Sequence, residues 1–293
     1  MTRSSLAGGL PPAILQAEST GGYGGEFSMS DAEFRRIAER VFAIAGIVLK
    51  DHKRQMVYTR LSRRLRSLNL SSFTDYMDLL DGSGAGAELT EFCNAVTTNL
   101  TSFFRESHHF DHLREEVLSP LAGGASRIRI WSAGCSTGEE PYSIAMTARA
   151  MGRSLASADL RILATDLDTN VLGKAKAGVY PEARTTDVPA DLRSGSMARR
   201  SAGEIEMTPA VKSLIAFRQL NLLHPWPFRG PFDAIFCRNV LIYFDAETKA
   251  ALVRRFAEAL TATGTLYLGH SESLLGEHPL LVSEGRTIYR RRA

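Results

Sequence analysis

The sequence predicts an α/β protein with an open, doubly wound parallel sheet, an N-terminal all-α domain and a small inserted β-subdomain. Helical periodicity without strand signals runs through residues 29–120, which predicts the helical domain. Short apolar strands then alternate with helices over residues 121–293, which is typical of parallel βαβ units. Proline and glycine break this alternation over residues 178–208, where we expect the insertion.

The composition fits a globular protein of about two domains. Its 293 residues are 44% hydrophobic and 23% charged, which excludes a mainly disordered chain or a small disulfide scaffold. No apolar run reaches the roughly 20 residues that span a bilayer, and the N-terminal stretch lacks a secretory apolar core. Cys93, Cys135 and Cys237 lie far apart and outside any metal-binding pattern, so we expect a cytoplasmic protein without a metal.

The first half of the chain carries the helical signals. Residues 1–28 are rich in Gly, Ser and Pro, which predicts a disordered tail. Ser30 and Glu33 have the spacing of a capping box at the start of a helix that ends at Gly46. Further helices are predicted at 50–68, 72–80, 88–98 and 106–118.

The second half carries the sheet signals. Strands are predicted at 127–131, 160–164, 214–220, 232–237 and 265–269, with a further strand-like run at 287–291. Helices are predicted at 139–151, 169–177 and 247–261. Within the insertion, residues 204–207 could form a strand. In such a sheet, ligands bind beyond the carboxyl ends of the strands.

The loop after the first strand predicts a site for a cationic ligand. Gly134 and Gly138 let the backbone turn tightly, and Glu139 and Glu140 begin the following helix. Two carboxylates and no lysine would repel a pyrophosphate but suit an amine or a sulfonium, which favours S-adenosylmethionine (AdoMet) over NAD or ATP. The alternative is that both glutamates only complement the helix dipole.

Two further strand ends carry polar residues. Asp166 ends the second strand, where a carboxylate binds a ribose diol, and Asp168 is expected to cap the next helix. Asn221 and Leu222 follow the third strand and could contact the edge and the face of an adenine.

The fourth strand ends in Arg238 and Asn239. Polar residues that interrupt an apolar strand are costly unless they face a cleft or a ligand. We therefore expect both side chains at the same site.

Five motifs in order now resemble one family. Residues 99–110 (NLTSFFRESHHF) are similar to the signature segment of the chemoreceptor glutamate methyltransferases, the CheR family, and residues 131–143 resemble its AdoMet motif. ATDLD, FCRNVLIYF and GHSES continue the match, so the resemblance covers roughly residues 30–293.

The resemblance implies a Rossmann-like methyltransferase domain behind the helical domain, with an inserted antiparallel β-subdomain. It implies methyl transfer from AdoMet to receptor glutamates, leaving S-adenosylhomocysteine (AdoHcy). The implied cofactor contacts are Asn99, Thr101, Arg105, Glu139, Asp166, Asn221, Leu222, Arg238 and Asn239, and Tyr243 stands near the methyl-transfer centre. Residues 193–203 lack the aromatic residues expected there, which leaves binding of a receptor C-terminal peptide open.

The implied chemistry needs few groups. A glutamate carboxylate is ionised near neutral pH, so no general base is required. We expect Arg105 to hold the cofactor or steer the carboxylate, and Tyr243 to orient the substrate oxygen. The alternatives are an ion pair at a helix start for Arg105 and an ordinary strand-end tyrosine for Tyr243. His108 and His109 diverge by about 100° on a helix, so we expect structural roles for both.

A basic face on the predicted helix 50–68 suggests a docking surface. Lys53, Arg60, Arg63 and Arg64 lie close together on a helical wheel, and an acidic receptor helix is the expected partner. The alternative is a solvated charge row. We expect a monomer, without nucleic acid or membrane insertion, that is recruited to membrane-bound receptor arrays.

Two other functions fit part of the pattern. A nucleic-acid methyltransferase would use the basic helix to bind phosphates, but an NPPY-like motif for a flipped base is missing. A non-catalytic AdoMet or AdoHcy sensor would share the cofactor residues and show no turnover.

Overall fold

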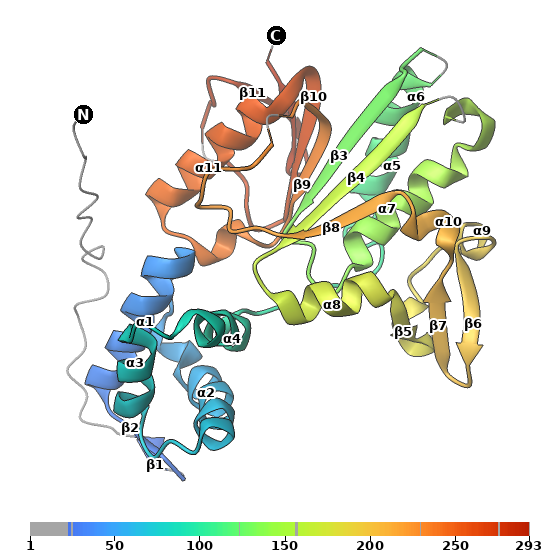
Figure 1. The fold of residues 1–293 in the computed structure, drawn as a ribbon. Helices are drawn as coiled ribbons and strands as arrows, with labels where there is room; N and C mark the ends of the chain where they lie inside the picture. The colour runs from blue at the N-terminus through green and yellow to red at the C-terminus, as the bar shows by residue number, and fades with distance from the viewer. Residues whose placement is uncertain are drawn as a thin grey trace. The chain divides into compact units, whose positions relative to one another are not determined.

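The computed structural model describes residues 23–24, 26–122, 124–155, 158–228, 230–274 and 276–292. The chain forms two compact units, of which the first ends at Val96 and the second begins at Thr97 (Figure 1). Most of the predicted tail lies outside the described residues. In its described part, β1 (Tyr23–Gly24) pairs antiparallel with β2 (Ser28–Met29).

The first unit is all helical after β2, as the sequence predicted. It contains α1 (Asp31–Ala45), the 3₁₀-helix η2 (Asp51–Lys53), α2 (Arg54–Leu68), α3 (Phe73–Asp81) and α4 (Gly86–Val96). The predicted capping box is present: the Ser30 hydroxyl accepts from the Glu33 amide at 3.2 Å, and the Glu33 carboxylate accepts from the Ser30 amide at 2.8 Å. Phe73 and Tyr76 are fully buried among apolar residues of the other helices, which forms a separate core.

The second unit is built on a seven-stranded sheet, which confirms the predicted fold class. Its strands are β3 (Arg127–Ala133), β4 (Asp159–Asp166), β8 (Ile215–Gln219), β9 (Phe232–Cys237), β10 (Leu260–Leu268), β11 (Leu281–Gly285) and β12 (Ile288–Arg291). The order is β11-β12-β10-β9-β3-β4-β8. The neighbouring strands among β10, β9, β3, β4 and β8 pair in parallel. At one edge, β12 pairs antiparallel with both β10 and β11. The order reverses around β3, so its carboxyl end is the expected place for a ligand.

Helices before and between the strands cover this sheet (Figure 1). They are α5 (His108–His112), the π-helix η3 (Leu113–Leu118), α6 (Ser119–Leu121), α7 (Glu139–Ala150), the 3₁₀-helix η4 (Gly152–Leu155), α8 (Thr169–Ala177), the 3₁₀-helix η6 (Leu241–Tyr243) and α11 (Ala246–Ala259). Phe110 and Leu113 share one core with Ile130 and Phe236 of the sheet. The segment 97–120 therefore packs with the second unit, although its helical pattern placed it in the predicted helical domain.

The insertion is a small antiparallel sheet, as predicted. β5 (Val179–Pro181), β6 (Met197–Ser201) and β7 (Glu204–Met207) pair in the order β5-β7-β6. The 3₁₀-helix η5 (Glu182–Thr185) and the short helix α9 (Ala190–Arg193) lie between β5 and β6, and α10 (Pro209–Lys212) leads from β7 to β8.

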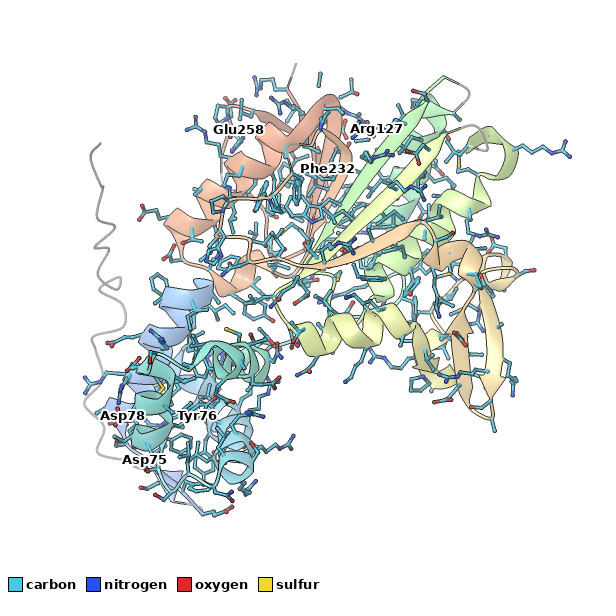
Figure 2. All side chains as sticks on the ribbon, in the orientation of Figure 1. Asp75, Tyr76, Asp78, Arg127, Phe232 and Glu258 are labelled. Carbon is cyan, nitrogen blue, oxygen red and sulfur yellow. The ribbon has the colours of Figure 1, made fainter. Side chains whose placement is uncertain are left out.

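An aromatic cluster fixes the centre of the sheet. Trp131 on β3 is fully buried, and its ring centre lies 4.7 Å from that of Trp226 and 5.5 Å from that of Phe232, which Figure 2 labels. Its indole N–H donates to the Thr165 hydroxyl on β4 at 2.9 Å. Because buried indole groups need a hydrogen-bond partner, this contact sets the register of the two strands that carry the site.

We predict that Ser30→Ala lowers the free energy of unfolding of the first unit by about 1 kcal/mol, because the Glu33 amide loses its acceptor. Urea denaturation followed by circular dichroism measures this change. Ser67→Ala is the control: its exposed hydroxyl only bonds the Arg64 carbonyl, so its effect should stay below about 0.5 kcal/mol. Equal effects of the two changes would contradict the role of the cap.

Candidate active site

The β3–α7 loop is held so tightly that glycine is required at two positions. Gly134 has φ +88°, and a Cβ there would lie 2.4 Å from Cγ2 of Val240. Gly138 has φ +98°, and a Cβ there would lie 2.9 Å from Cβ of Ala175. Cys135 in this loop is a buried free thiol whose pKa is raised by burial. The loop therefore packs directly against the ends of β9 and α8.

Asp166 lies at the end of β4 and contacts this loop. Its carboxylate accepts from the Ser136 amide at 2.7 Å and from the Asp168 amide at 3.0 Å. Burial raises the pKa of Asp166 to about 6, against the two amide hydrogen bonds that lower it. Asp168 caps α8 by accepting from the amides of Asn170 and Val171, as predicted. Each oxygen of a carboxylate fixed in this way keeps a lone pair for a further donor.

The segment that begins the second unit runs across the same loop. The Asn99 side chain donates to Asp168 at 2.7 Å, and the Asn99 carbonyl accepts from the Ser136 hydroxyl at 3.0 Å. Arg184 in η5 donates to the Thr101 carbonyl at 3.0 Å. The structure thus places Asn99 and Thr101 beside the β3–α7 loop.

Arg105 and Tyr243 both reach this segment. Arg105 is half-buried and donates to the Leu100 carbonyl at 3.1 Å. The Tyr243 hydroxyl, at the end of η6, donates to the Thr98 carbonyl at 3.4 Å. The two groups assigned to the substrate therefore contact carbonyls only two residues apart.

The two glutamates at the start of α7 are partnered differently. Glu139 is fully buried, lies 2.6 Å from the Arg184 guanidinium and accepts from the Thr137 hydroxyl at 2.6 Å. Glu140 accepts from the Ser132 hydroxyl at 2.7 Å. Burial raises the pKa of both carboxyls. The sequence did not point to Arg184, because nothing in the pattern of the insertion links this residue to the β3–α7 loop.

Arg238 is the buried cation of the site. Its side chain is 2% exposed and lies 3.7 Å from Glu140 and 3.8 Å from Glu106, and it donates to the Arg105 carbonyl. Burial lowers its pKa, and the two carboxylates oppose that shift. Within the described residues, Nε and Nη1 of Arg238 and one Glu106 oxygen have no hydrogen-bond partner. Such buried polar atoms are typical of a site that completes its hydrogen bonds with a ligand.

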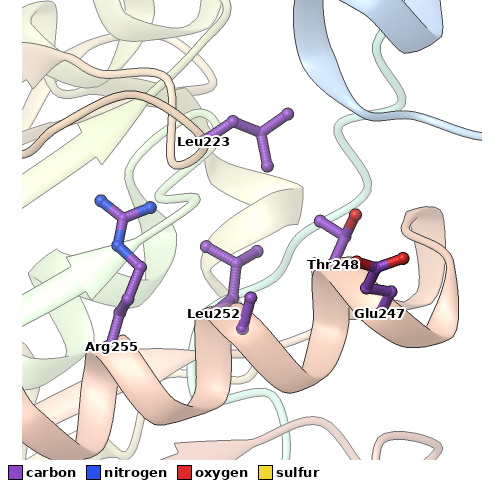
Figure 3. A pocket seen from close by; sticks show the side chains of 6 residues that line it. Leu223, Glu247, Thr248, Leu252 and Arg255 are labelled. Carbon is purple, nitrogen blue, oxygen red and sulfur yellow. The ribbon is translucent and has the colours of Figure 1, made fainter. Parts of the chain in front are cut away.

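The residues predicted for the adenine follow β8. The Leu220 amide donates to the Asp166 carbonyl at 2.9 Å, which places Asn221 beside the end of β4. Leu222 is 8% exposed, and its carbonyl accepts from Arg255 of α11 at 2.6 Å. A pocket lies next to these residues between this loop and α11 (Figure 3). Its lining residues are Leu223, Glu247, Thr248, Ala251, Leu252 and Arg255.

The histidines have structural contacts, as predicted. His108 and His109 both lie within hydrogen-bond distance of the Arg286 carbonyl, at 3.3 Å and 3.1 Å. Burial lowers the pKa of His109 to about 3, so its ring is neutral at physiological pH. In the part of the chain that the structure describes, no group of three His, Cys, Asp or Glu side chains could hold a metal ion.

The residues predicted for the docking surface have different surroundings in the structure, and Arg64 is paired. Its guanidinium donates to both Glu88 oxygens, at 3.0 Å and 2.5 Å, so a bidentate ion pair within the first unit already neutralises it. Arg60 donates to the Ala95 carbonyl at 3.2 Å. Lys53 is half-buried, whereas Arg63 is exposed. The wheel could not show these contacts, because the acceptors lie on α4.

The residues present fit a ligand that combines a ribose with a cationic centre. The loop leaves no room for a Cβ at Gly134, Asp166 offers acceptors at the end of β4, and Glu139 at the helix start is a fully buried carboxylate. Residues 99–288 match the family model for the "CheR methyltransferase, SAM binding domain". Residues 32–97 match that for the "CheR methyltransferase, all-alpha domain". The chain is therefore an AdoMet-binding methyltransferase with an all-α domain.

Curated relatives named as chemotaxis protein methyltransferases match at least 90% of this chain. The chain is 42% identical to a "Chemotaxis protein methyltransferase" of Escherichia coli, over 98% of both chains. It is 43% identical to "Chemotaxis protein methyltransferase 2" of Pseudomonas aeruginosa, over 90% of this chain and 94% of that protein. The chain belongs to the CheR family of chemotaxis protein methyltransferases, which confirms the resemblance. None of the described helices is both long and apolar enough to span a membrane.

We predict that AdoHcy binding weakens as the pH falls through about 6, the pKa of buried Asp166. A ribose diol needs the ionised carboxylate as acceptor, so binding lowers this pKa, and the Kd should rise up to about tenfold per pH unit below it. Calorimetry between about pH 5 and pH 8 measures the profile.

Asp166→Asn is the matched control for this profile. It should bind AdoHcy weakly at every pH and lose the part of the pH dependence that Asp166 contributes. A wild-type Kd that stays constant through the whole range would contradict the assignment of Asp166 to the diol.

Proposed function

We propose that this chain transfers the methyl group of AdoMet to the γ-carboxylate of glutamates in the cytoplasmic helices of methyl-accepting chemotaxis receptors. Family membership supports the chemotaxis methyltransferase activity. The observation that carries the glutamate is the paired position of Arg105 and Tyr243, whose polar groups contact neighbouring carbonyls at one side of the cofactor loop. A guanidinium and a phenol hydroxyl together suit an incoming carboxylate.

The cofactor would be held by residues from four strand ends. Asp166 would accept from the ribose diol, Asn221 and Leu222 would contact the adenine, and Glu139 would face the cationic part. When bound, AdoMet supplies an electrophilic methyl group on a positively charged sulfur. The remaining contacts proposed are Asn99, Thr101, Arg105, Gly134, Arg238 and Asn239.

The chain's own residues need only orient the nucleophile. A glutamate carboxylate is ionised near neutral pH, so no base has to remove a proton. Arg105 would attract it, and Tyr243 would donate to one oxygen and leave the other free to attack. Arg105 donates to the Leu100 carbonyl at 3.1 Å and Tyr243 to the Thr98 carbonyl at 3.4 Å, and turning toward a substrate would exchange these bonds for bonds to its carboxylate. Holding two oppositely charged reactants in line, away from water, favours their reaction.

Partners and location follow from the same proposal. We propose that the protein acts in the cytoplasm as a monomer and is recruited to membrane-bound receptor arrays. We propose that Lys53 and Arg63 of the first unit, with Arg60 beside them, contact an acidic receptor helix; Arg60 also donates to the Ala95 carbonyl, and Arg64 is paired with Glu88.

The decisive test uses labelled AdoMet and receptor-containing membranes. We expect label on the receptor band and its release as methanol under mild alkali, because carboxyl methyl esters hydrolyse there and N-methyl groups do not. Receptors with the modified glutamates changed to alanine are the control. Alkali-stable label, label on nucleic acid, or AdoHcy binding without any turnover would each overturn the proposal.

Arg63→Glu should raise the KM for the receptor about three- to tenfold, the effect of reversing one exposed charge, and leave the AdoHcy Kd unchanged. Steady-state methylation at two salt concentrations measures this, and high salt should shrink the difference. Arg35→Glu is the matched control, because Arg35 is also exposed, lies on α1 and gives the same change in net charge. Equal KM values for the two variants would place docking elsewhere.

A further inference from the structure

Glu272 is a buried carboxylate that connects two strand ends of the site. It lies in the GHSES motif after β10, and the residue is 7% exposed. One carboxylate oxygen accepts from the Asn239 amide at 2.7 Å and from the Gly269 amide at 2.7 Å. The other accepts from the Ile242 amide at 3.1 Å. Three amides from two loops therefore converge on one side chain.

These hydrogen bonds set the shape of the loop after β9. Asn239 has φ +59°, an unusual conformation for a residue with a Cβ, and η6 follows it and ends at Tyr243. An ionised acceptor bonds amides about twice as strongly as a neutral one. Leaving such amides buried without an acceptor would cost their full desolvation penalty. The carboxylate thus stabilises a turn that the backbone alone disfavours.

Gly269 supports the same turn from the other side. A Cβ on Gly269 would lie 2.5 Å from the Asn239 side-chain nitrogen and 2.8 Å from its amide nitrogen. The Glu272 amide in turn donates to the Gly269 carbonyl at 2.8 Å, which closes the 269–272 turn. Asn239 is therefore enclosed by a glycine and a carboxylate of one turn.

We propose that Glu272 is a positioning residue, which sets Asn239 for the cofactor and Tyr243 for the substrate through their backbone. This inference rests on the assignment of Asn239 and Tyr243 in the proposed function. Glu272 acts through backbone amides, and we assign it no direct contact with the cofactor or the substrate. Its role is to fix the distance between Asn239 and Tyr243, which lie four residues apart in the sequence.

Glu272→Gln tests the inference, because it keeps the shape of the side chain and replaces one acceptor oxygen by an NH₂ group. At least one of the three amides then faces a donor. We expect the Kd for AdoHcy, measured by calorimetry on the full chain, to rise at least about tenfold. We also expect kcat to fall while the KM for the receptor stays unchanged.

Asp233→Asn is the matched control. Asp233 is a partly buried carboxylate at the opposite end of β9 and accepts from the Arg129 amide at 2.8 Å. It should lower the Tm and leave the AdoHcy Kd within about twofold. If Glu272→Gln likewise lowers the Tm and leaves the Kd within that range, Glu272 is only structural and the inference is wrong.

Two further variants separate the possible failures. Asn239→Ala removes the proposed contact itself, so binding that weakens there but not in Glu272→Gln overturns the positioning role and leaves the site intact. If neither weakens binding, the assignment of Asn239 fails as well. Should Glu272→Gln not fold, Gly269→Ala pushes on Asn239 and leaves the carboxylate in place. An unchanged Kd in that variant overturns the inference.

Discussion

The burial of negative charge at the carboxyl ends of β3 and β4 is the constraint on which the site depends. Glu139 is fully buried, Glu140 and Asp166 are partly buried, and burial raises the pKa of each. Buried charges are tolerated only when partners compensate them. Arg184 compensates the first, Arg238 lies near the second, and two amides donate to the third.

The same arginines connect parts of the second unit that are far apart in sequence. Arg184 joins the insertion to α7 and to the segment before α5, because it contacts Glu139 and the Thr101 carbonyl. Arg238 joins the end of β9 to Glu106 and to the Arg105 carbonyl. The two arginines that compensate the carboxylates therefore also hold the segment before α5 in place across the site.

The sequence predicted most of the fold because periodicity reports which face of an element is buried. Periodicity does not report which core a buried face packs against, so the helices between Glu106 and Leu118 were predicted as part of the helical domain. β11 was not foreseen, since only Leu281 of its residues is buried and the strand lacks apolar alternation.

The position of a candidate residue was predictable where a strand end and a motif coincide, as at Asp166, and not where it depends on tertiary contacts. Arg184 and Glu272 act through groups far away in sequence, and Glu272 was visible only as part of a motif without a role. Arg64 likewise has a tertiary contact that a helical wheel could not show, because its partner Glu88 lies on another helix.

The position of the two thiols of the second unit makes them poor nucleophiles. Cys135 and Cys237 are completely buried beside the carboxylates, and the pKa of each lies well above its ordinary value. Nucleophilic attack by sulfur requires the thiolate, which this surrounding suppresses. Both sulfur atoms are therefore held as neutral thiols, the form that reacts least with an alkyl donor.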